Sequence, residues 1–223
     1  QNIGASGHTD FSFTVNRTEY QKALDVLANE RGKGFKAREI IGDFELADVK
    51  ARIRLLEGLL QEYLPSVGQP PPERIPAALD ILNQLGTGYW GLGDARRATA
   101  YWSRMLELAR GTTSRSQQGY ALGNLGNAYA DLGEPRKAIE FHEQALKIDR
   151  EIGNRRGEGQ DLGNLGIAYG ALGETRKAIE HYEQALRIKP GYIDAHNNLG
   201  NALFDLGKVT EAIEQYERAL RID

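Results

Sequence analysis

The chain has 223 residues, of which 40% are hydrophobic and 26% charged, and its formal net charge is −3. This length makes one large or two small domains and is enough to bury a sizeable core. The near balance of charge argues against wholesale electrostatic capture of nucleic acid or of an anionic membrane. No apolar run approaches the ~20 residues that a membrane span needs. There is no cysteine, which excludes disulfides, thiolate metal sites and cysteine nucleophiles.

The start of the chain carries two further indications. The first residue is Gln1 and the one methionine is Met105, so we expect a processed or truncated piece of a longer protein. No charged-then-apolar signal segment opens the sequence. We expect a cytoplasmic location.

A block of sequence recurs four times, and such repeats are sought first because a missed period changes the whole fold prediction. Residues 124–129 read Asn-Leu-Gly-Asn-Ala-Tyr and return, with one change each, 40 residues later at 164–169 and, after 34 more, at 198–203. A weaker copy lies 40 residues upstream, at 84–89. Each copy is followed by a Leu-Gly pair, an alanine and a second leucine, at Leu92, Ala98 and Leu106; Leu132, Ala138 and Leu146; Leu172, Ala178 and Leu186; and Leu206, Ala212 and Leu220.

Each repeat reads as two helices. Leu122 and Leu125 fall on one stripe at helical spacing. Gly133 is expected to end the first helix in the left-handed conformation, and Pro135 suits the first turn of the second. Gly126 is expected to let the two helices approach closely. A single helical pair cannot bury its faces, so stacked neighbours must supply the core.

This pattern resembles the tetratricopeptide repeat (TPR) family over residues 79–223. The 40-residue spacing with its Gly-Asn-Arg-Arg corner is similar to the repeats of kinesin light chain and of many bacterial multidomain signalling proteins. The resemblance implies an all-α fold, a right-handed superhelix of about four helix-turn-helix repeats whose first helices line a concave surface. It implies binding rather than catalysis, with no cofactor. The expected units are 79–117, 118–157, 158–191 and 192–223.

The N-terminal segment, residues 1–68, is expected to be mostly helical and to be followed by a Pro-rich linker at 69–78. Apolar and polar residues alternate as in a strand at 11–15, and helices are predicted over 20–29 and 45–63. Two interpretations stay open: a helical cap over the first repeat, or a separate effector or docking domain.

Three sequence features are of kinds found in nucleotide-binding, nucleic-acid-binding or metal-binding proteins. We give each of them a structural interpretation instead. Residues 86–91 match Gly-x-Gly-x-x-Gly, but a dinucleotide site needs a strand before this motif, and here it lies inside a predicted helix. The basic stretch at 31–38 reads as a solvated loop, so no nucleic-acid partner is expected. None of the histidines has a second metal ligand at helical spacing, so no metal site is expected. We expect packing or surface roles for all four: His8, His142, His181 and His196.

The first helices carry a polar face opposite their apolar stripe, and there we expect a peptide or protein segment to bind. A carboxamide recurs at one position in all four repeats, and such a group pairs with both the C=O and the N–H of a peptide unit. The arrangement is similar to the asparagine ladder of the O-GlcNAc transferase superhelix. Aspartates on the same face favour a neutral to basic segment. The candidate peptide-binding residues are Gln84, Trp90, Tyr120, Asn124, Asn127, Asp131, Asn164, Asn198, Asn201, Phe204 and Asp205.

Two alternatives remain open at this stage. The asparagines can instead satisfy the backbone of a neighbouring helix or corner. The array can also be a structural or regulatory arm of a larger signalling protein that self-associates through an uncapped C-terminal repeat. A clamp for acidic chaperone tails is not expected, because the positions that carry cations in such TPR domains are Asn83, Gly123, Asp194 and Asn198 here.

Overall fold

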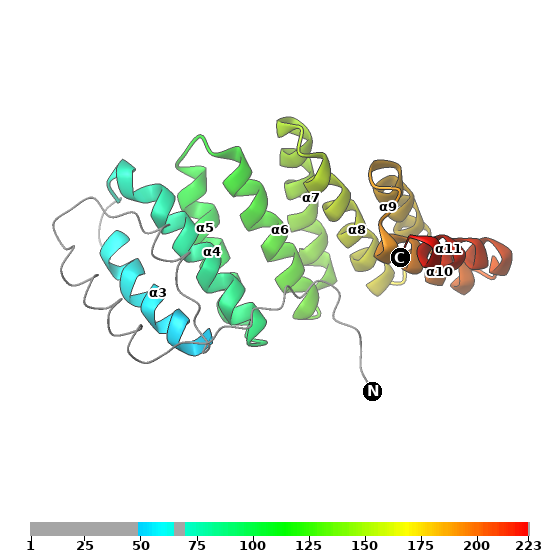
Figure 1. The fold of residues 1–223 in the computed structure, drawn as a ribbon, viewed down its shortest axis with the longest axis horizontal. Helices are drawn as coiled ribbons and strands as arrows, with labels where there is room; N and C mark the ends of the chain where they lie inside the picture. Colours follow the sequence, from blue (N-terminus) through cyan, green and yellow to red (C-terminus); the bar gives the residue numbers. More distant parts are fainter. Residues whose placement is uncertain (1–48, 65–69, 223) are drawn as a thin grey trace. The chain divides into compact units, whose positions relative to one another are not determined.

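The computed structural model describes residues 49–64 and 70–222, and every regular element within them is helical (Figure 1). The chain divides into two compact units, residues 1–92 and 93–223. The strand-like run at 11–15, the helix at 20–29 and the basic stretch at 31–38 lie outside the described residues. Among the described helices, none has the length and apolar character needed to cross a membrane.

The first unit contains α3 (Val49–Tyr63), the 3₁₀ helix η1 (Pro72–Arg74) and α4 (Ile75–Gly91). Helix α3 packs closely on α4, because a Cβ built on Gly88 would lie only 3.1 Å from Ile53 Cγ1. Tyr89 of α4 donates its hydroxyl hydrogen to Glu57 Oε1 of α3 at 2.7 Å. One side of the first predicted repeat helix is therefore covered by α3.

The boundary between the Pro-rich segment and the repeats differs from the expected one. Helix α4 begins at Ile75, inside the stretch expected as linker up to 78. Pro76 stands in its first turn, where a missing N–H has no intrahelical partner to lose, so the proline does not delay the helix. Residues 86–91 lie within α4, as predicted, and the Gly-x-Gly-x-x-Gly motif is thus not a strand-to-helix turn.

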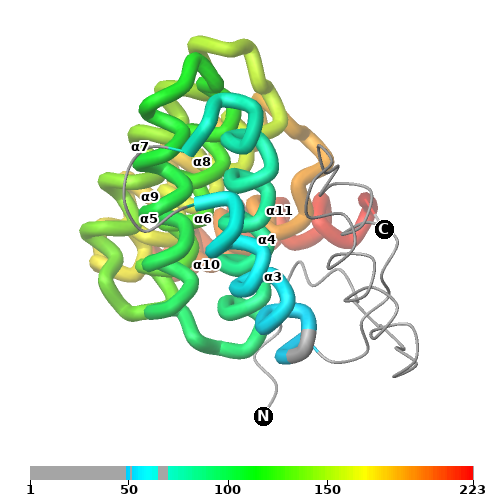
Figure 2. Tube along the Cα trace, turned by 90° about the vertical axis from the view of Figure 1, so that its left-hand side faces the viewer, coloured from blue at the N-terminus to red at the C-terminus, as the bar shows by residue number. Residues whose placement is uncertain are grey.

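The second unit contains α5 (Ala95–Arg110), α6 (Arg115–Asp131), α7 (Pro135–Ile152), α8 (Arg155–Ala171), α9 (Thr175–Ile188), α10 (Ile193–Asp205) and α11 (Val209–Arg221). Three antiparallel hairpins, α6–α7, α8–α9 and α10–α11, follow one another, and the first helices α6, α8 and α10 adjoin in turn. Figure 2 shows α7 and α9 on one side and α6 and α8 on the other. The hairpins confirm the predicted helix-turn-helix repeats.

The turns inside the hairpins follow from the Leu-Gly pairs. Gly133 and Gly173 have φ angles of 72° and 74°, in the left-handed region that residues with a Cβ rarely adopt. Helix α7 then begins at Pro135, as the sequence predicted. The recurring glycine therefore ends each first helix at the same place.

Close approach inside each hairpin is achieved by an aromatic ring lying against a glycine. A Cβ on Gly126 would lie 2.5 Å from His142 Nε2, and one on Gly166 would lie 2.4 Å from Tyr182 Cε1. Any side chain at these two positions would overlap a ring of the second helix. The close approach expected at Gly126 is confirmed, and the group that makes it is His142.

The core of the second unit continues from one repeat to the next. One buried cluster joins Leu146 of α7, Leu165 of α8, Ala185 of α9 and Ala195 of α10. Stacking of successive hairpins therefore supplies the apolar interior that a single helical pair lacks.

Candidate peptide-binding surface

A pocket of about 450 Å³ lies between α6 and α8, the first helices of two successive repeats. Four of the residues predicted from the sequence line it: Tyr120, Asn124, Asn127 and Asn164. They come together because they occupy neighbouring positions on the polar faces of adjoining helices. Within the second unit, these four predicted residues therefore lie together around one pocket.

Two of the pocket asparagines are bonded to each other. Asn164 Nδ2 donates to Asn127 Oδ1 at 2.9 Å, and both side chains are partly buried. The bond leaves Asn127 Nδ2 as a donor and Asn164 Oδ1 as an acceptor. The pair thus offers an N–H donor and a C=O acceptor side by side, the complement of a peptide unit.

Asp161 is a buried acid on α8 that lines the same pocket. His142 Nδ1 lies 3.2 Å from Asp161 Oδ1, and the other oxygen, Oδ2, has no hydrogen-bond partner within the described part of the chain. Burial raises the pKa of Asp161 above its ordinary value, and the hydrogen bond from His142 opposes part of that rise. The pocket therefore holds a carboxyl group whose charge is poorly compensated.

Asp149, near the end of α7, is the second buried acid of the pocket. Asn154 Nδ2 donates to its Oδ1 at 3.1 Å, while Asn154 Oδ1 accepts from the Gly157 amide at 3.2 Å and caps α8. Burial is the main cause that raises the pKa of Asp149. A Cβ on Gly157 would lie 1.7 Å from Asp149 Oδ2, so only glycine fits beside this carboxylate.

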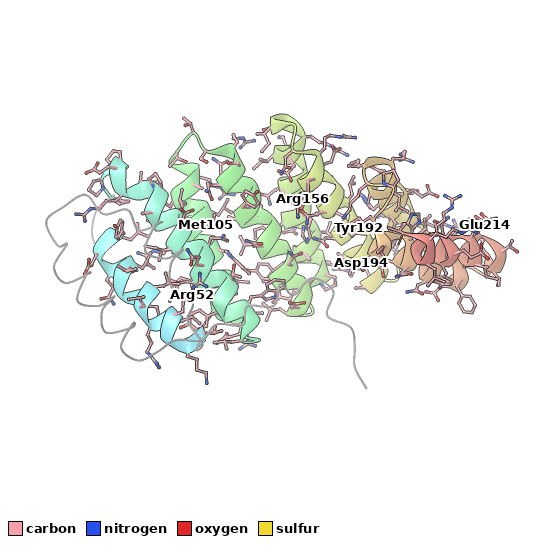
Figure 3. All side chains as sticks on the ribbon, in the orientation of Figure 1. Arg52, Met105, Arg156, Tyr192, Asp194 and Glu214 are labelled. Atoms are coloured by element: carbon pink, nitrogen blue, oxygen red, sulfur yellow. The ribbon has the colours of Figure 1, made fainter. Side chains whose placement is uncertain are left out.

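Arg156 is the cation among the lining residues and is exposed near the start of α8, labelled in Figure 3. The sequence analysis looked for cations only at the positions used by TPR domains that bind acidic chaperone tails, and Arg156 is not one of them. Asp149 and Asp161 were also missed, although a signal was present. At the repeat position of Asp161, the adjoining repeats carry Ala121 and Ala195, so the acid replaces a residue that belongs to the core.

Two predicted residues are hydrogen bonded to neighbouring helices. Gln84 Oε1 accepts a hydrogen bond from Arg52 Nη2 of α3, within the first unit. Asn201 Oδ1 accepts from the Tyr216 hydroxyl of α11 at 2.8 Å. At these two positions the alternative interpretation, a carboxamide that satisfies a neighbouring helix, describes the structure.

The remaining predicted residues do not line the α6–α8 pocket. Trp90 lies on α4 of the first unit and is 37% exposed. Asp131 is the exposed last residue of α6. On α10, Asn198 is partly buried, while the other two are exposed: Phe204 and Asp205.

The histidines of the described residues have packing roles. His142 lies against Gly126, and His196 is hydrogen bonded through both ring nitrogens, to Gln215 Oε1 at 2.8 Å and to the Pro190 carbonyl at 2.9 Å. His181 stacks on the Tyr169 ring with centroids 5.1 Å apart. In the part of the chain that the structure describes, no cluster of three or more His, Asp or Glu side chains is arranged to hold a metal ion.

Comparison with known proteins decides the family. Models of the tetratricopeptide repeat match residues 77–151, 121–191 and 164–223. The chain belongs to the tetratricopeptide repeat family. Membership of this family, and likeness to solved structures of TPR proteins, support a protein–protein interaction scaffold.

Solved structures of the same fold cover most of the TPR chain. MamA is 25% identical, with a TM-score of 0.62 and coverage of 85% of this chain and 94% of that one. BtubC from P. vanneervenii is 18% identical over 92% of this chain and 87% of that one, with a TM-score of 0.72. Kinesin light chain TPR-like repeats from Podosopora anserina are 19% identical, with a TM-score of 0.63 and coverage of 92% and 93%. At 18% and 19% identity the likeness is one of fold alone.

Two curated relatives match a short stretch. Aspartate kinase from Pseudomonas putida is 49% identical over 49 residues, which are 22% of this chain and 12% of that protein. Aspartate kinase from Pseudomonas fluorescens is 45% identical over 49 residues, again 12% of its length. The match spans only a small part of either enzyme and does not indicate enzymatic function.

Proposed function

We propose that this TPR chain is a non-enzymatic module that binds an extended segment of another protein along the polar faces of α6, α8 and α10. The observation that carries the proposal is the pocket between α6 and α8, which gathers Tyr120, Asn124, Asn127 and Asn164. Carboxamides hold a peptide backbone whatever its side chains are, and aromatic rings add apolar contact. A cytoplasmic location suits such a module.

The hydrogen bond between Asn127 and Asn164 supports a backbone-binding role. The free Nδ2 of Asn127 donates to a peptide carbonyl, and the free Oδ1 of Asn164 accepts from a peptide N–H. Further along the same row, the partly buried Asn198 of α10 is the next carboxamide that the bound segment would meet. Phe204, 58% exposed on α10, provides apolar surface at that end.

The experiment is retention of a library of end-blocked nonapeptides on the immobilised chain, followed by titration of the best-retained peptide. Asn164→Ala and Asn198→Ala are expected to weaken binding by about 0.5–1.5 kcal/mol each, the net contribution of a hydrogen bond. Gln144→Ala is the matched control, because Gln144 is an exposed carboxamide on the second helix α7. Equal affinity of wild type and all variants would reject the groove proposal.

A structural arm that self-associates is the second candidate, favoured by the apolar surface of α11. Ile213 and Leu220 are 52% and 79% exposed on this helix. Contiguous exposed apolar residues are typical of protein interfaces. Light scattering distinguishes the candidates: self-association predicts a mass that rises with concentration and returns to that of a monomer in Leu220→Lys.

A further inference from the structure

Two buried carboxylates of the α6–α8 pocket face the same strip of α6. A Cβ on Gly119 would lie 3.3 Å from Asp149 Oδ1, and one on Gly123 would lie 3.7 Å from Asp161 Oδ1. Gly119 and Gly123 are one helical turn apart, so they present backbone without side chains to the pocket. The acids come from two other elements, α7 and α8, and both approach this bare strip.

Arg156, the only Lys or Arg among the described residues that line the pocket, is not buried, and His142 is the buried partner of Asp161. Besides burial, the charge of Asp149 raises the pKa of Asp161 further, so the two carboxylates are close enough to repel each other. Their direct partners are His142 and Asn154, and Asp161 Oδ2 has none in the described chain. Arg156 is exposed to solvent, where its charge is screened.

The corresponding place between the next two first helices is filled by the chain itself. Gly163, 40 residues after Gly123, has the ring of Tyr192 against it, with Cε1 only 3.0 Å from a Cβ at this glycine. Tyr192 comes just before α10 and is labelled in Figure 3. At Gly123 no ring occupies the space, and the pocket of about 450 Å³ is open there. The pocket is thus a gap in the stack that an incoming side chain can enter.

We propose that this pocket binds the ammonium group of a lysine side chain carried by the bound segment. The inference rests on the proposed function, since it names the side chain that the α6–α8 pocket selects. The methylenes of lysine lie along the Gly119–Gly123 strip and the Tyr120 ring. The ammonium group reaches Asp161 and Asp149.

Lysine fits this site better than arginine because of how the acceptors are arranged. A guanidinium fork matches two oxygens of one carboxylate, whereas an ammonium group directs three N–H donors to separate acceptors. Here the acceptors are single oxygens of two carboxylates on different helices, together with the free Oδ1 of Asn164. An ammonium group entering the pocket also relieves the repulsion between Asp149 and Asp161.

The test is a set of end-blocked nonapeptides that differ only at the central residue, which is lysine, arginine, acetyl-lysine, norleucine or glutamate. On the immobilised full chain we expect lysine to be retained about tenfold better than acetyl-lysine or norleucine, and Asp161→Asn to abolish this preference. Gly123→Leu places a side chain in the pocket without a backbone clash and should have the same effect. Glu140→Gln, the same charge change on the exposed side of α7, should leave the preference intact.

The outcomes separate this inference from the proposed function. Peptides retained with no preference at the central residue, or with arginine equal to lysine, would overturn the lysine pocket and leave the groove proposal standing. If no peptide is retained, the groove proposal fails and the pocket is tested directly with N-acetyl-lysine methylamide in ¹H–¹⁵N spectra. Shifts at the Gly119 and Gly123 amides with this probe, and not with its norleucine analogue, support the pocket; no shifts overturn it. Melting temperatures of Asp161→Asn and Gly123→Leu verify that both variants are folded.

Discussion

His142 of α7 and Asp161 of α8 are hydrogen bonded across the boundary between two repeats, with Nδ1 and Oδ1 3.2 Å apart. Both side chains are almost completely buried, at 1% and 7% exposed. The adjoining repeats carry other residues at these two positions. Tyr182 stands at the repeat position of His142, and Ala121 and Ala195 stand at that of Asp161. The polar pair therefore stands where the adjoining repeats carry a ring and an alanine.

The first prediction is that the two residues of this pair are energetically coupled. His142→Phe keeps a ring against Gly126 and leaves Asp161 without its partner, which should lower the free energy of unfolding by about 1–3 kcal/mol. Adding Asp161→Ala restores the combination that the other repeats use and should recover most of the loss. A double-mutant cycle by chemical denaturation measures the coupling. Additive effects of the two substitutions would show that the hydrogen bond contributes nothing.

The second prediction concerns the ring that lies against Gly166. A Cβ there would lie 2.4 Å from Tyr182 Cε1, so Gly166→Ala must push the ring or the helix aside and should cost about 1–3 kcal/mol. Gly170→Ala is the matched control on the same helix, because its nearest neighbour, Ala178 Cβ, is 4.0 Å away. The control should be stabilising by about 0.5–1 kcal/mol. Equal melting temperatures of the two variants would refute the packing described for α8 and α9.

The third prediction is the pH dependence that Asp161 introduces. Burial raises its pKa in the folded chain above the ordinary 3.8, so the folded state holds this proton more tightly than the unfolded state. The contribution of Asp161 to stability is then greatest at acid pH, falls as pH rises from 3.8 through the raised pKa, and is constant above it. The Asp161→Asn variant has no titratable group at this position and should not lose stability in this way as pH rises.

The measurement is the unfolding free energy of wild type and Asp161→Asn in steps from about pH 3 to about pH 6. The stability of the variant relative to wild type should increase with pH over this range and then level off. Asp149, whose pKa burial also raises, is present in both proteins, and because its charge acts on Asp161 the difference includes the coupling between the two carboxylates. A difference independent of pH would mean that Asp161 titrates alike in the folded and unfolded states.

The fold was predictable because each recurring residue has a local physical reason. Gly133 adopts the left-handed turn, Pro135 opens a helix, and Gly126 accepts a ring, and all three are visible in the sequence. Helix starts were less accurate: α8 begins at Arg155 where the unit was expected at 158. Its N-cap, Asn154, lies upstream of the recurring Asn-Leu-Gly block, so the block alone does not fix where the helix begins.

Of the residues that line the pocket, the sequence could predict mainly those that recur at the same position in different repeats. Asn124 and Asn164 hold the same repeat position on adjoining helices, which is why the sequence places them together. The hydrogen bond of Gln84 to Arg52 could not be predicted, because Arg52 belongs to α3, which no repeat relates to the array. Asp161 was missed for the opposite reason: it departs from the repeat, and its burial depends on tertiary packing against His142.

The last prediction tests whether the two bonded asparagines act on a ligand as one group. In the empty chain Asn164 Nδ2 donates to Asn127 Oδ1 at 2.9 Å, so each amide orients the other. Asn164→Ala removes the acceptor offered to a peptide N–H and leaves Asn127 without its partner. Asn127→Ala removes the donor offered to a peptide carbonyl and leaves Asn164 without its partner. Each single substitution should weaken binding of the best-retained nonapeptide by about 0.5–1.5 kcal/mol. The double substitution should cost less than the sum of the two, because either one already disrupts the pair. Calorimetric titrations of wild type and the three variants measure these values, and strictly additive losses would show that the two amides bind independently.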